Sequence, residues 1–192
     1  MNINFGNGIV IRDSEATDIE PIAIPNKFYR IALLKIERAM RANPHHVLGS
    51  FFPLKHTFAN GMYIREIFVP KGYIVMTYIH KQSHPAFQVS GDTTVIEPDG
   101  NKRIKGYSAF ITPAGTKRIC YCHEDTVWVT VHLNPDNKEN IEDIEERIYA
   151  NHYNELCANS DNEEIEQEDT VKLNIMELIK EVSSESALSL QS

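Results

Sequence analysis

The sequence lacks several features that would place it in a well-defined class of protein. It contains no stretch of eighteen apolar residues, and its first twelve residues lack the basic and apolar regions of a secretion signal. A transmembrane or secreted protein is therefore not expected. Only three cysteines are present, Cys120, Cys122 and Cys157, and they form no CxxC pair. This scarcity argues against a disulfide framework and predicts a reducing cytoplasm as the compartment.

Sequence motifs of several enzyme classes are also missing. There is no GxSxG, P-loop or GxGxxG segment, which argues against an α/β-hydrolase, a P-loop nucleotidase and a dinucleotide-binding enzyme. Basic residues are dispersed rather than gathered in a stripe, so nucleic acid is not an expected partner. Cys120 and Cys122 alternate with Tyr121, a spacing that favours small core residues on one strand face over metal ligands.

The acidic charge is concentrated at one end of the chain. The net charge is −8, but residues 135–192 carry 16 acidic and 4 basic side chains, a net of −12. The first 134 residues carry 11 acidic and 15 basic side chains, a net of +4. The main domain is therefore mildly basic, and an acidic extension follows it.

The hydrophobic pattern changes period twice along the chain. Apolar residues near helical spacing predict an amphipathic helix over about 26–42, ended by Pro44. Short β-type runs follow, separated by turn signals such as Asn60-Gly61 and Pro113-Ala114-Gly115. The predicted strands cover roughly 51–58, 62–69, 73–81, 86–97, 102–112, 117–121 and 126–133. Because no helices lie between them, an antiparallel sandwich or small barrel is expected.

Three segments are expected from this pattern. Residues 1–49 form an N-terminal arm and helix, residues 50–134 form the β domain, and residues 135–192 form an acidic helical extension. Two helical stripes, within 141–156 and 171–182, are interrupted by an acidic linker. Such helices need a partner surface, which is either the barrel or a second subunit, and a homo-oligomer is expected.

Two segments of the β region resemble the motifs of the cupin superfamily. Residues 72–91 contain a strand that ends at His80, a polar hairpin, and Phe87-Gln88-Val89-Ser90-Gly91, similar to the close of the first cupin motif. Residues 106–115, GYSAFITPAG, resemble the glycine, apolar strand and Pro-x-Gly turn of the second motif. The resemblance covers about residues 50–134 and implies a double-stranded β-helix, or jelly roll. The chain also resembles small cupin proteins encoded in bacteriophage genomes, which implies a host cytoplasm as its location.

The sequence departs from the family pattern at two positions that usually supply metal ligands. The first motif of the family has His-x-His followed by Glu, whereas this chain reads His80-Lys81-Gln82-Ser83-His84, with His84 in the place of the Glu. The second motif usually supplies a histidine three residues after its Gly, where this chain has Arg118. A metal site in this chain would therefore need a different ligand set.

Such a ligand set can be assembled from three histidines. His80 ends one predicted strand, His132 lies near the end of another, and His84 lies just beyond a turn from His80. These three can converge at the barrel mouth, with Glu66 or Gln88 as a weak fourth ligand. The metals that suit this set are Zn, Fe, Mn and Ni. The alternative is that the three imidazoles form hydrogen bonds at the mouth without a metal.

Basic and aromatic side chains suggest a second use for the cavity. A guanidinium at the position of Arg118 suits a carboxylate or phosphate, which it can bind with two hydrogen bonds. Strand alternation allows only one of Arg65 and Glu66 to face inward. The candidate ligand-binding residues are Arg118, Lys81, Arg65, Tyr78, Gln88 and Trp128.

Three function classes follow. The first is a binding protein for a small anionic, sugar-like or nucleotide-like molecule. The second is a divalent-metal enzyme of the isomerase, epimerase or dioxygenase type, as the cupin resemblance implies. The third is a structural or interaction protein, such as one of a phage particle, that uses the barrel as a scaffold. The fold alone does not choose among them.

Overall fold

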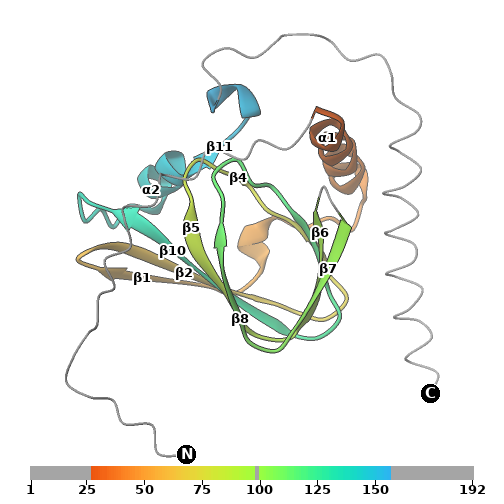
Figure 1. Ribbon diagram of the computed structural model, residues 1–192, viewed down its shortest axis with the longest axis horizontal. Coiled ribbons are helices and arrows are strands. Elements are labelled where there is room, and N and C mark those ends of the chain that lie inside the picture. Colours follow the sequence, from red (N-terminus) through yellow and green to blue (C-terminus); the bar gives the residue numbers. More distant parts are fainter. Residues whose placement is uncertain (1–26, 98–99, 157–192) are drawn as a thin grey trace, which may run out of the picture.

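The computed structural model describes residues 27–97 and 100–156, which form a barrel of two antiparallel sheets with helices packed against it (Figure 1). The five-stranded sheet has the order β1-β2-β10-β5-β8, the four-stranded sheet β3-β9-β6-β7, and a two-stranded sheet pairs β11 with β4. The elements are α1 (Lys27–Ala42), β1 (Leu54–Ala59), β2 (Gly61–Val69), β3 (Ile74–Met76), β4 (Ile79–His80), β5 (His84–Ser90), β6 (Asp92–Glu97), β7 (Gly100–Lys105), β8 (Ser108–Thr112), β9 (Ile119–Cys122), β10 (Thr126–Asn134), α2 (Ile141–Ile148) and β11 (Tyr149–Ala150), with 3-10 turns at Gly49–Phe51 and Tyr153–Glu155.

This arrangement confirms the predicted jelly roll. Every strand pair is antiparallel, and among the described residues no helix interrupts the chain between β3 and β10. The expected arm at residues 1–24, the linker after residue 158 and the stripe at 171–182 lie outside the described residues. No helix in the described part of the chain is long and apolar enough to span a membrane.

Three predicted strands are each divided in two: the run expected at 73–81 becomes β3 and β4, and two other runs break at a glycine. The run expected at 86–97 breaks at Gly91, and the run expected at 102–112 breaks at Gly106. Both glycines have positive φ, +108° and +65°, and the Gly106 amide donates to the Gly91 carbonyl over 2.7 Å. A Cβ at Gly91 would lie 2.3 Å from the Thr126 hydroxyl oxygen. The chain therefore crosses between the two sheets at these glycines, and a single glycine without an Asn-Gly or Pro-x-Gly signal did not mark the crossing in pattern analysis.

Alternation along the strands of the five-stranded sheet sets the inner wall of the barrel. Arg65 of β2 lies opposite Thr130 of β10, which lies opposite Ala86 of β5, and Ala86 lies opposite Phe110 of β8. All four line an internal cavity. Their neighbours in sequence point outward, since successive side chains of a strand alternate between faces.

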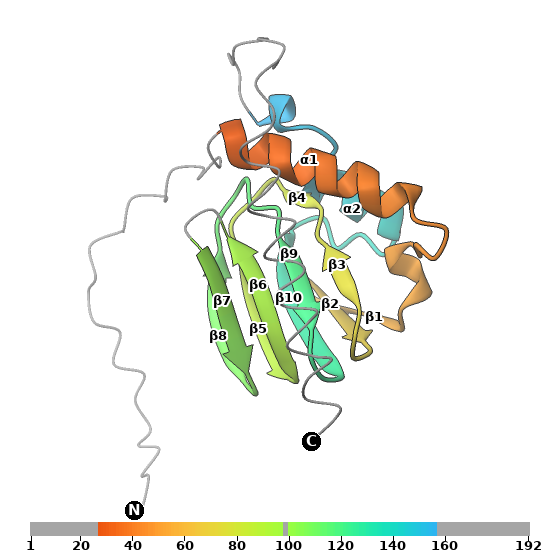
Figure 2. The same ribbon diagram turned by 90° about the vertical axis from the view of Figure 1, so that its right-hand side faces the viewer.

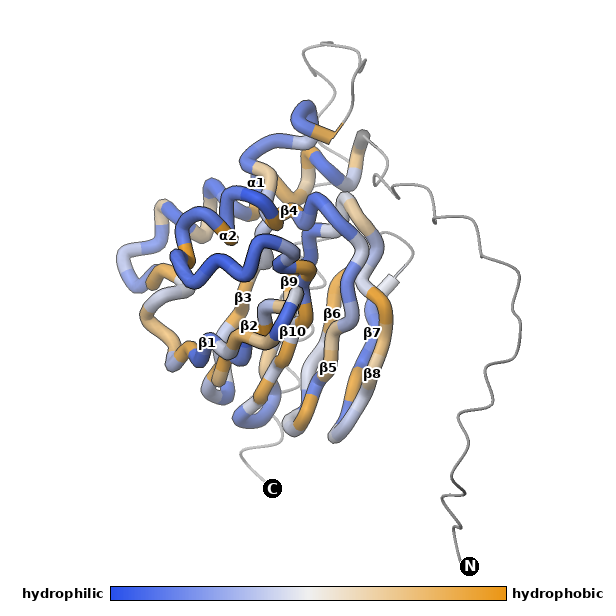
Figure 3. The backbone as a smooth tube through the Cα atoms, turned by 90° about the vertical axis from the view of Figure 1, so that its left-hand side faces the viewer, coloured by the Kyte–Doolittle hydropathy of each residue, from blue (hydrophilic) through white to orange (hydrophobic). Residues whose placement is uncertain are grey.

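The outer face of the same sheet is apolar as well. Figure 3 shows hydrophobic stretches along β5, β8 and β10, and Val89, Leu133 and Met62 are 47%, 66% and 42% exposed. An exposed apolar face of this kind favours contact with another protein surface. The expected homo-oligomer stays a prediction, which this face supports.

Helix α1 lies across one end of the four-stranded sheet and packs on its outer face (Figure 2). Leu33 and Ile36 of its apolar side are buried together with Ile96 of β6 and Ile119 of β9. The Tyr29 hydroxyl donates to the Ile96 carbonyl over 2.9 Å, which satisfies its polar group inside this apolar contact. The helix predicted over 26–42 is thus present, and its apolar side packs on the domain.

Helix α2 and β11 close the end of the barrel where β4 lies. Asn140 caps α2, its side-chain oxygen accepting the Asp143 amide hydrogen over 2.9 Å. Ile144 and Ile148, 0% and 2% exposed, pack on Tyr63 of the five-stranded sheet. Strand β11 then pairs with β4, with Tyr149 opposite His80. Of the two surfaces expected to receive the C-terminal helices, the barrel is therefore the one that α2 contacts.

Candidate metal centre and ligand cavity

Three histidines from three separate segments converge at the end of the barrel near β4 and α2. His80 ends β4, His84 begins β5, and His132 lies in β10. Each offers a ring nitrogen, and these nitrogens all lie within 4.8 Å of one another. The side chains are 8%, 3% and 4% exposed, and His84 lies between the other two, with ring centroids 4.3 Å from His80 and 4.4 Å from His132. The structure therefore brings together the three histidines that the sequence analysis grouped as candidate ligands.

Backbone contacts explain why the three imidazoles meet. The His80 amide donates to the Thr116 carbonyl over 3.1 Å, and the Gly115 amide donates to the His80 carbonyl over 2.7 Å. These bonds fix β4 against the Pro113-Ala114-Gly115 turn. His84 and His132 lie on neighbouring strands of the five-stranded sheet, each two residues from the pair Ala86 and Thr130. Two-residue periodicity then places both side chains on the inner face.

Hydrogen bonds to carbonyl oxygens orient two of the rings. The Nδ1 atoms of His80 and His84 lie 3.4 Å and 3.1 Å from the carbonyl oxygens of Thr116 and Gln82. A carbonyl can only accept, so each Nδ1 carries the hydrogen and each Nε2 keeps its lone pair. The His132 Nε2 forms a hydrogen bond with the Thr130 hydroxyl over 3.1 Å. Its Nδ1 is therefore the ring nitrogen that is left to bind a metal ion. Such partners are typical of metal-binding histidines, because they fix the ring and the tautomer.

The electrostatic environment keeps these imidazoles neutral at pH 7. Burial, then the neighbouring His84 and His132, places the pKa of His80 well below its ordinary value. Burial also lowers the pKa of His84, with a further contribution from Arg118. The pKa of His132 falls to about 3 through burial, His84 and Arg65. Neutral imidazole is the form that binds a metal ion.

The donor set fits a divalent transition ion. Ring nitrogens bind such ions at about 2.0–2.1 Å, so two ligands of one ion lie at most about 4.2 Å apart. The largest separation allowed by the present arrangement is 4.8 Å. Small side-chain rotations are therefore enough to bring all three nitrogens to one ion. Glu66 and Gln88, considered as a fourth ligand, are not part of this group.

A cavity of about 480 Å³ extends from the histidines into the barrel. His80 and His84 line it, and its walls are largely apolar, with Ile67, Ile104 and Trp128 among them. The charged side chains that line it are Arg65, Glu97, Lys102 and Arg118. This volume lies within the range of pockets that bind small molecules.

Arg118 lines the cavity as expected, but its charge is compensated. Its Nε lies 3.1 Å from a Glu97 carboxylate oxygen, and its Nη1 donates to the Thr112 hydroxyl over 3.1 Å. Its guanidinium also lies over the Phe110 ring, 5.5 Å from the centroid. Because Glu97 neutralises Arg118, the cation repulsion expected from an arginine at a ligand position is weakened. Glu97 faces the cavity from β6, and sequence analysis gave no sign of this pairing.

Arg65 faces the same cavity, but it differs from Arg118 in its hydrogen bonding. Strand alternation allowed only one of Arg65 and Glu66 to face inward, and the structure selects Arg65. Its Nε is buried without a hydrogen-bond partner among the described residues. Tyr78 and Trp128 also line the cavity, as the sequence analysis expected of ligand-binding side chains.

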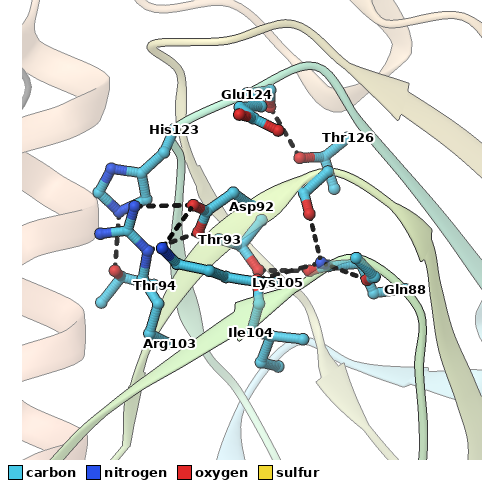
Figure 4. A network of polar contacts seen from close by, with 12 residues as sticks. Gln88, Asp92, Thr93, Thr94, Arg103, Ile104, Lys105, His123, Glu124 and Thr126 are labelled. Atoms are coloured by element: carbon cyan, nitrogen blue, oxygen red, sulfur yellow. Dashed lines mark hydrogen bonds and ion pairs between the residues drawn. The ribbon is translucent and has the colours of Figure 1, made fainter.

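Two other expected ligand-binding residues are used for structure. The Gln88 amide nitrogen donates to the carbonyls of Gly91, Ile104 and Gly106 at 2.9–3.1 Å, and its oxygen accepts from Thr93 (Figure 4). Gln88 is 0% exposed and does not line the cavity. Its polar atoms are fully used in closing the end of the barrel four residues along β5 from His84.

Lys81 is likewise committed to the protein itself. Its Nζ donates to the Glu146 carbonyl over 2.8 Å and lies 3.4 Å from a Glu155 carboxylate oxygen. It therefore holds the segment that contains α2 and does not line the cavity. Pattern analysis could place Lys81 beside His80 but could not see the C-terminal segment that takes its charge.

Tyr149 is a cavity residue that the sequence analysis did not identify. Its ring meets His80 edge-on at 5.2 Å and His132 at 6.5 Å, and it lines the cavity. Burial raises the pKa of its hydroxyl, so the group stays protonated and can donate a hydrogen bond. It comes from β11, beyond the expected end of the β domain. Tyr149 lies inside the stripe at 141–156 that the sequence analysis assigned to a helix, whereas the helix ends at Ile148 and Tyr149 begins β11.

The sheet order and the antiparallel pairing define a double-stranded β-helix, the jelly-roll fold that the cupin resemblance implied. No protein-family model and none of the curated protein sequences matches the chain. Among solved structures it is similar to ectoine synthase from P. lautus, with 11% identity, 49% of this chain and 72% of that chain covered, and a TM-score of 0.41. It is also similar to KdgF from Halomonas sp. (12%, 50% and 88%, 0.40) and to a cupin domain from Bordetella pertussis (13%, 43% and 93%, 0.35). These likenesses concern the fold.

Proposed function

We propose that the protein holds a divalent transition metal through His80, His84 and His132 and presents it to a small molecule in the adjoining cavity. The observation that carries the proposal is the convergence of three buried, neutral imidazoles whose nitrogens lie within 4.8 Å of one another. Imidazole suits Zn, Fe and Ni in particular. Bound there, such an ion would act as a Lewis acid on an oxygen of the small molecule.

The residues of the chain provide the surroundings for this chemistry. Thr116 and Gln82 orient two of the imidazoles through their carbonyls. The Tyr149 hydroxyl can donate a hydrogen bond beside the histidines, and the apolar walls exclude water from the bound molecule. The second candidate is a binding protein without a metal, which the arginines at the cavity wall favour.

Metal content separates the two candidates. Protein without an affinity tag is expected to retain about one equivalent of Zn²⁺ or Co²⁺ after dialysis, measured by elemental analysis. His84→Ala and His132→Ala should each lose the ion, because two imidazoles bind a divalent ion far more weakly than three. A matched control is the double variant His45→Ala/His46→Ala, since these exposed histidines are not among the residues that line the cavity. Equal metal content in all four proteins would refute the metal centre.

A further inference from the structure

We propose that Arg65 is the anchor for a carboxylate, so that the molecule bound in the cavity is a small organic acid with an apolar body. The inference deepens the proposed small-molecule function of the cavity and rests on it, but it does not require the metal. It starts from a difference between the two arginines that line the cavity.

Arg118 has its partners within the protein, whereas Arg65 has none among the described residues. The Arg118 guanidinium is held by Glu97 and Thr112, each at 3.1 Å. The Arg65 Nε is buried and unpartnered, and no hydrogen bond or ion pair to its guanidinium is formed by the described part of the chain. A buried polar group without a partner destabilises the folded chain, and more so when it is charged. An anion bound in the cavity would remove that cost.

The charges around the cavity also favour an anion. Arg65, Lys102 and Arg118 contribute three positive charges to the lining, and Glu97 contributes one negative charge. The lining therefore carries a net charge of +2, and a divalent ion at the histidines would increase it. Such a lining attracts an anion and repels a cation.

The remainder of the lining narrows the class of anion. Arg65 offers one planar guanidinium, which matches the two oxygens of a carboxylate. Ile67 and Trp128 lie two residues further along their strands on the same inner face, and Phe110 lies in the same cross-strand row as Arg65. Apolar side chains therefore lie beside the Arg65 guanidinium in this direction. A carboxylate with a compact apolar body fits a site that combines one guanidinium with an apolar wall.

The position of Arg65 relates the carboxylate to the histidines. Thr130 lies opposite Arg65, and His132 lies two residues from Thr130 on the same strand face. Two residues along a strand span about 7 Å. A molecule whose carboxylate binds Arg65 can therefore place an adjacent oxygen-bearing carbon next to His132, while its apolar part points to Trp128.

A pair of isosteric probes tests the inference. Cyclohexanecarboxylate and its neutral analogue cyclohexanecarboxamide are titrated into the protein, and the fluorescence of Trp128, the single tryptophan, reports binding. The carboxylate is expected to bind the unaltered protein about 10- to 100-fold more tightly than the amide, as charge-assisted hydrogen bonds predict. Arg65→Met should abolish this preference, and Arg65→Lys should keep part of it. Glu66→Gln, on the outer face of the same strand, serves as the matched control and should leave it unchanged.

Titrations with both chelator-treated and Zn²⁺-loaded protein keep this inference separate from the proposed function. An Arg65-dependent preference in the chelated protein supports the inference even if no metal is retained. Metal retention together with equal binding of acid and amide overturns the inference and leaves the metal centre intact. A preference that survives in Arg65→Met, or the absence of detectable carboxylate binding to the unaltered protein, also overturns it. Thermal unfolding and metal content of Arg65→Met show whether the variant is folded.

Discussion

At the scale of single residues, the pKa of a charged side chain and its effect on stability depend on the residue with which it pairs. Asp92 of β6 illustrates this on the outer face of the four-stranded sheet, away from the cavity (Figure 4). Arg103 binds both of its carboxylate oxygens, at 2.5 and 2.8 Å, and Lys105 lies 3.8 Å away. The hydrogen bonds from Arg103 lower the pKa of Asp92 from its ordinary value of 3.8.

This lowered pKa predicts how stability depends on pH. The folded-state pKa of Asp92 lies below its unfolded value, so its contribution is complete above that unfolded value and is lost as the pH falls through the folded pKa. Asp92→Asn should lower the free energy of unfolding by about 1 kcal/mol at pH 7, a value limited by the exposure of Arg103. The difference from the unaltered protein should shrink below about pH 4.

Urea unfolding between pH 7 and pH 3 checks this expectation. Lys105→Met is a suitable comparison, because Lys105 is 72% exposed and should contribute little at any pH. If the effect of Asp92→Asn were the same at pH 3 as at pH 7, packing rather than ionisation would be its cause.

The candidate site was predictable to the extent that strand alternation decides which side chains face inward. Alternation and the hairpin after His80 were sufficient to group His80 with His84 and His132. The same reasoning placed Arg65 or Glu66 inward but could not choose between them. Long-range partners lay beyond it: the Glu97 that neutralises Arg118 comes from β6, and two of the carbonyls that bind Gln88 belong to Ile104 of β7 and to Gly106, which follows β7. Such pairings depend on sheet topology, which one sequence does not display.

At the scale of elements, α2 is the segment for which the structure differs most from the expectation based on sequence. The composition changes after residue 134, and this change suggested that the acidic extension begins there. In the structure Ile144 and Ile148 share a buried cluster with Tyr63 of β2, and β11 pairs with His80 of β4. The acidic residues lie on the solvent side of α2. The two isoleucines on its other side determine where the helix packs.

The buried isoleucine of α2 gives a direct test of this packing. Ile144→Ala should lower the free energy of unfolding by about 2–5 kcal/mol, because Ile144 is fully buried and its removal leaves a cavity against Tyr63. Ile141→Ala, at a half-buried position of the same helix, should cost distinctly less. Chemical denaturation of the two variants measures both effects. A loss below about 0.5 kcal/mol for Ile144→Ala would mean that the barrel is stable independently of α2.

Elements were predictable where the period of the apolar residues was uninterrupted. Helix α1 spans Lys27–Ala42, close to the 26–42 expected, and β2 and β10 lie close to their expected ranges. Two of the three divided runs share one physical cause. At Gly91 and Gly106 the chain passes through positive φ from one sheet to the other, and a single glycine is a weaker turn signal than Asn-Gly or Pro-x-Gly.

At the scale of the whole molecule, the proposed metal centre connects distant parts of the chain. Its three histidines come from β4, β5 and β10, which belong to two different sheets, and β11 and the turn after Pro113 support β4. An ion bound there would be held by the folded barrel and not by the unfolded chain, in which His80 and His132 lie 52 residues apart. Metal binding should therefore stabilise the whole fold and not only the local site.

The size of this stabilisation follows from mass action. Free Zn²⁺ at 100 times its dissociation constant should raise the free energy of unfolding by about 2.7 kcal/mol. For a chain of this length that corresponds to an increase in Tm of roughly 5–11 °C. Calorimetry of chelator-treated protein, with and without added Zn²⁺, measures the shift. The His132→Ala variant should show almost no shift, whereas His45→Ala/His46→Ala should show the full one, because its three cavity histidines are intact. An equal increase for His132→Ala would place the stabilising ion elsewhere on the molecule and would contradict the assignment of His80, His84 and His132 as its ligands.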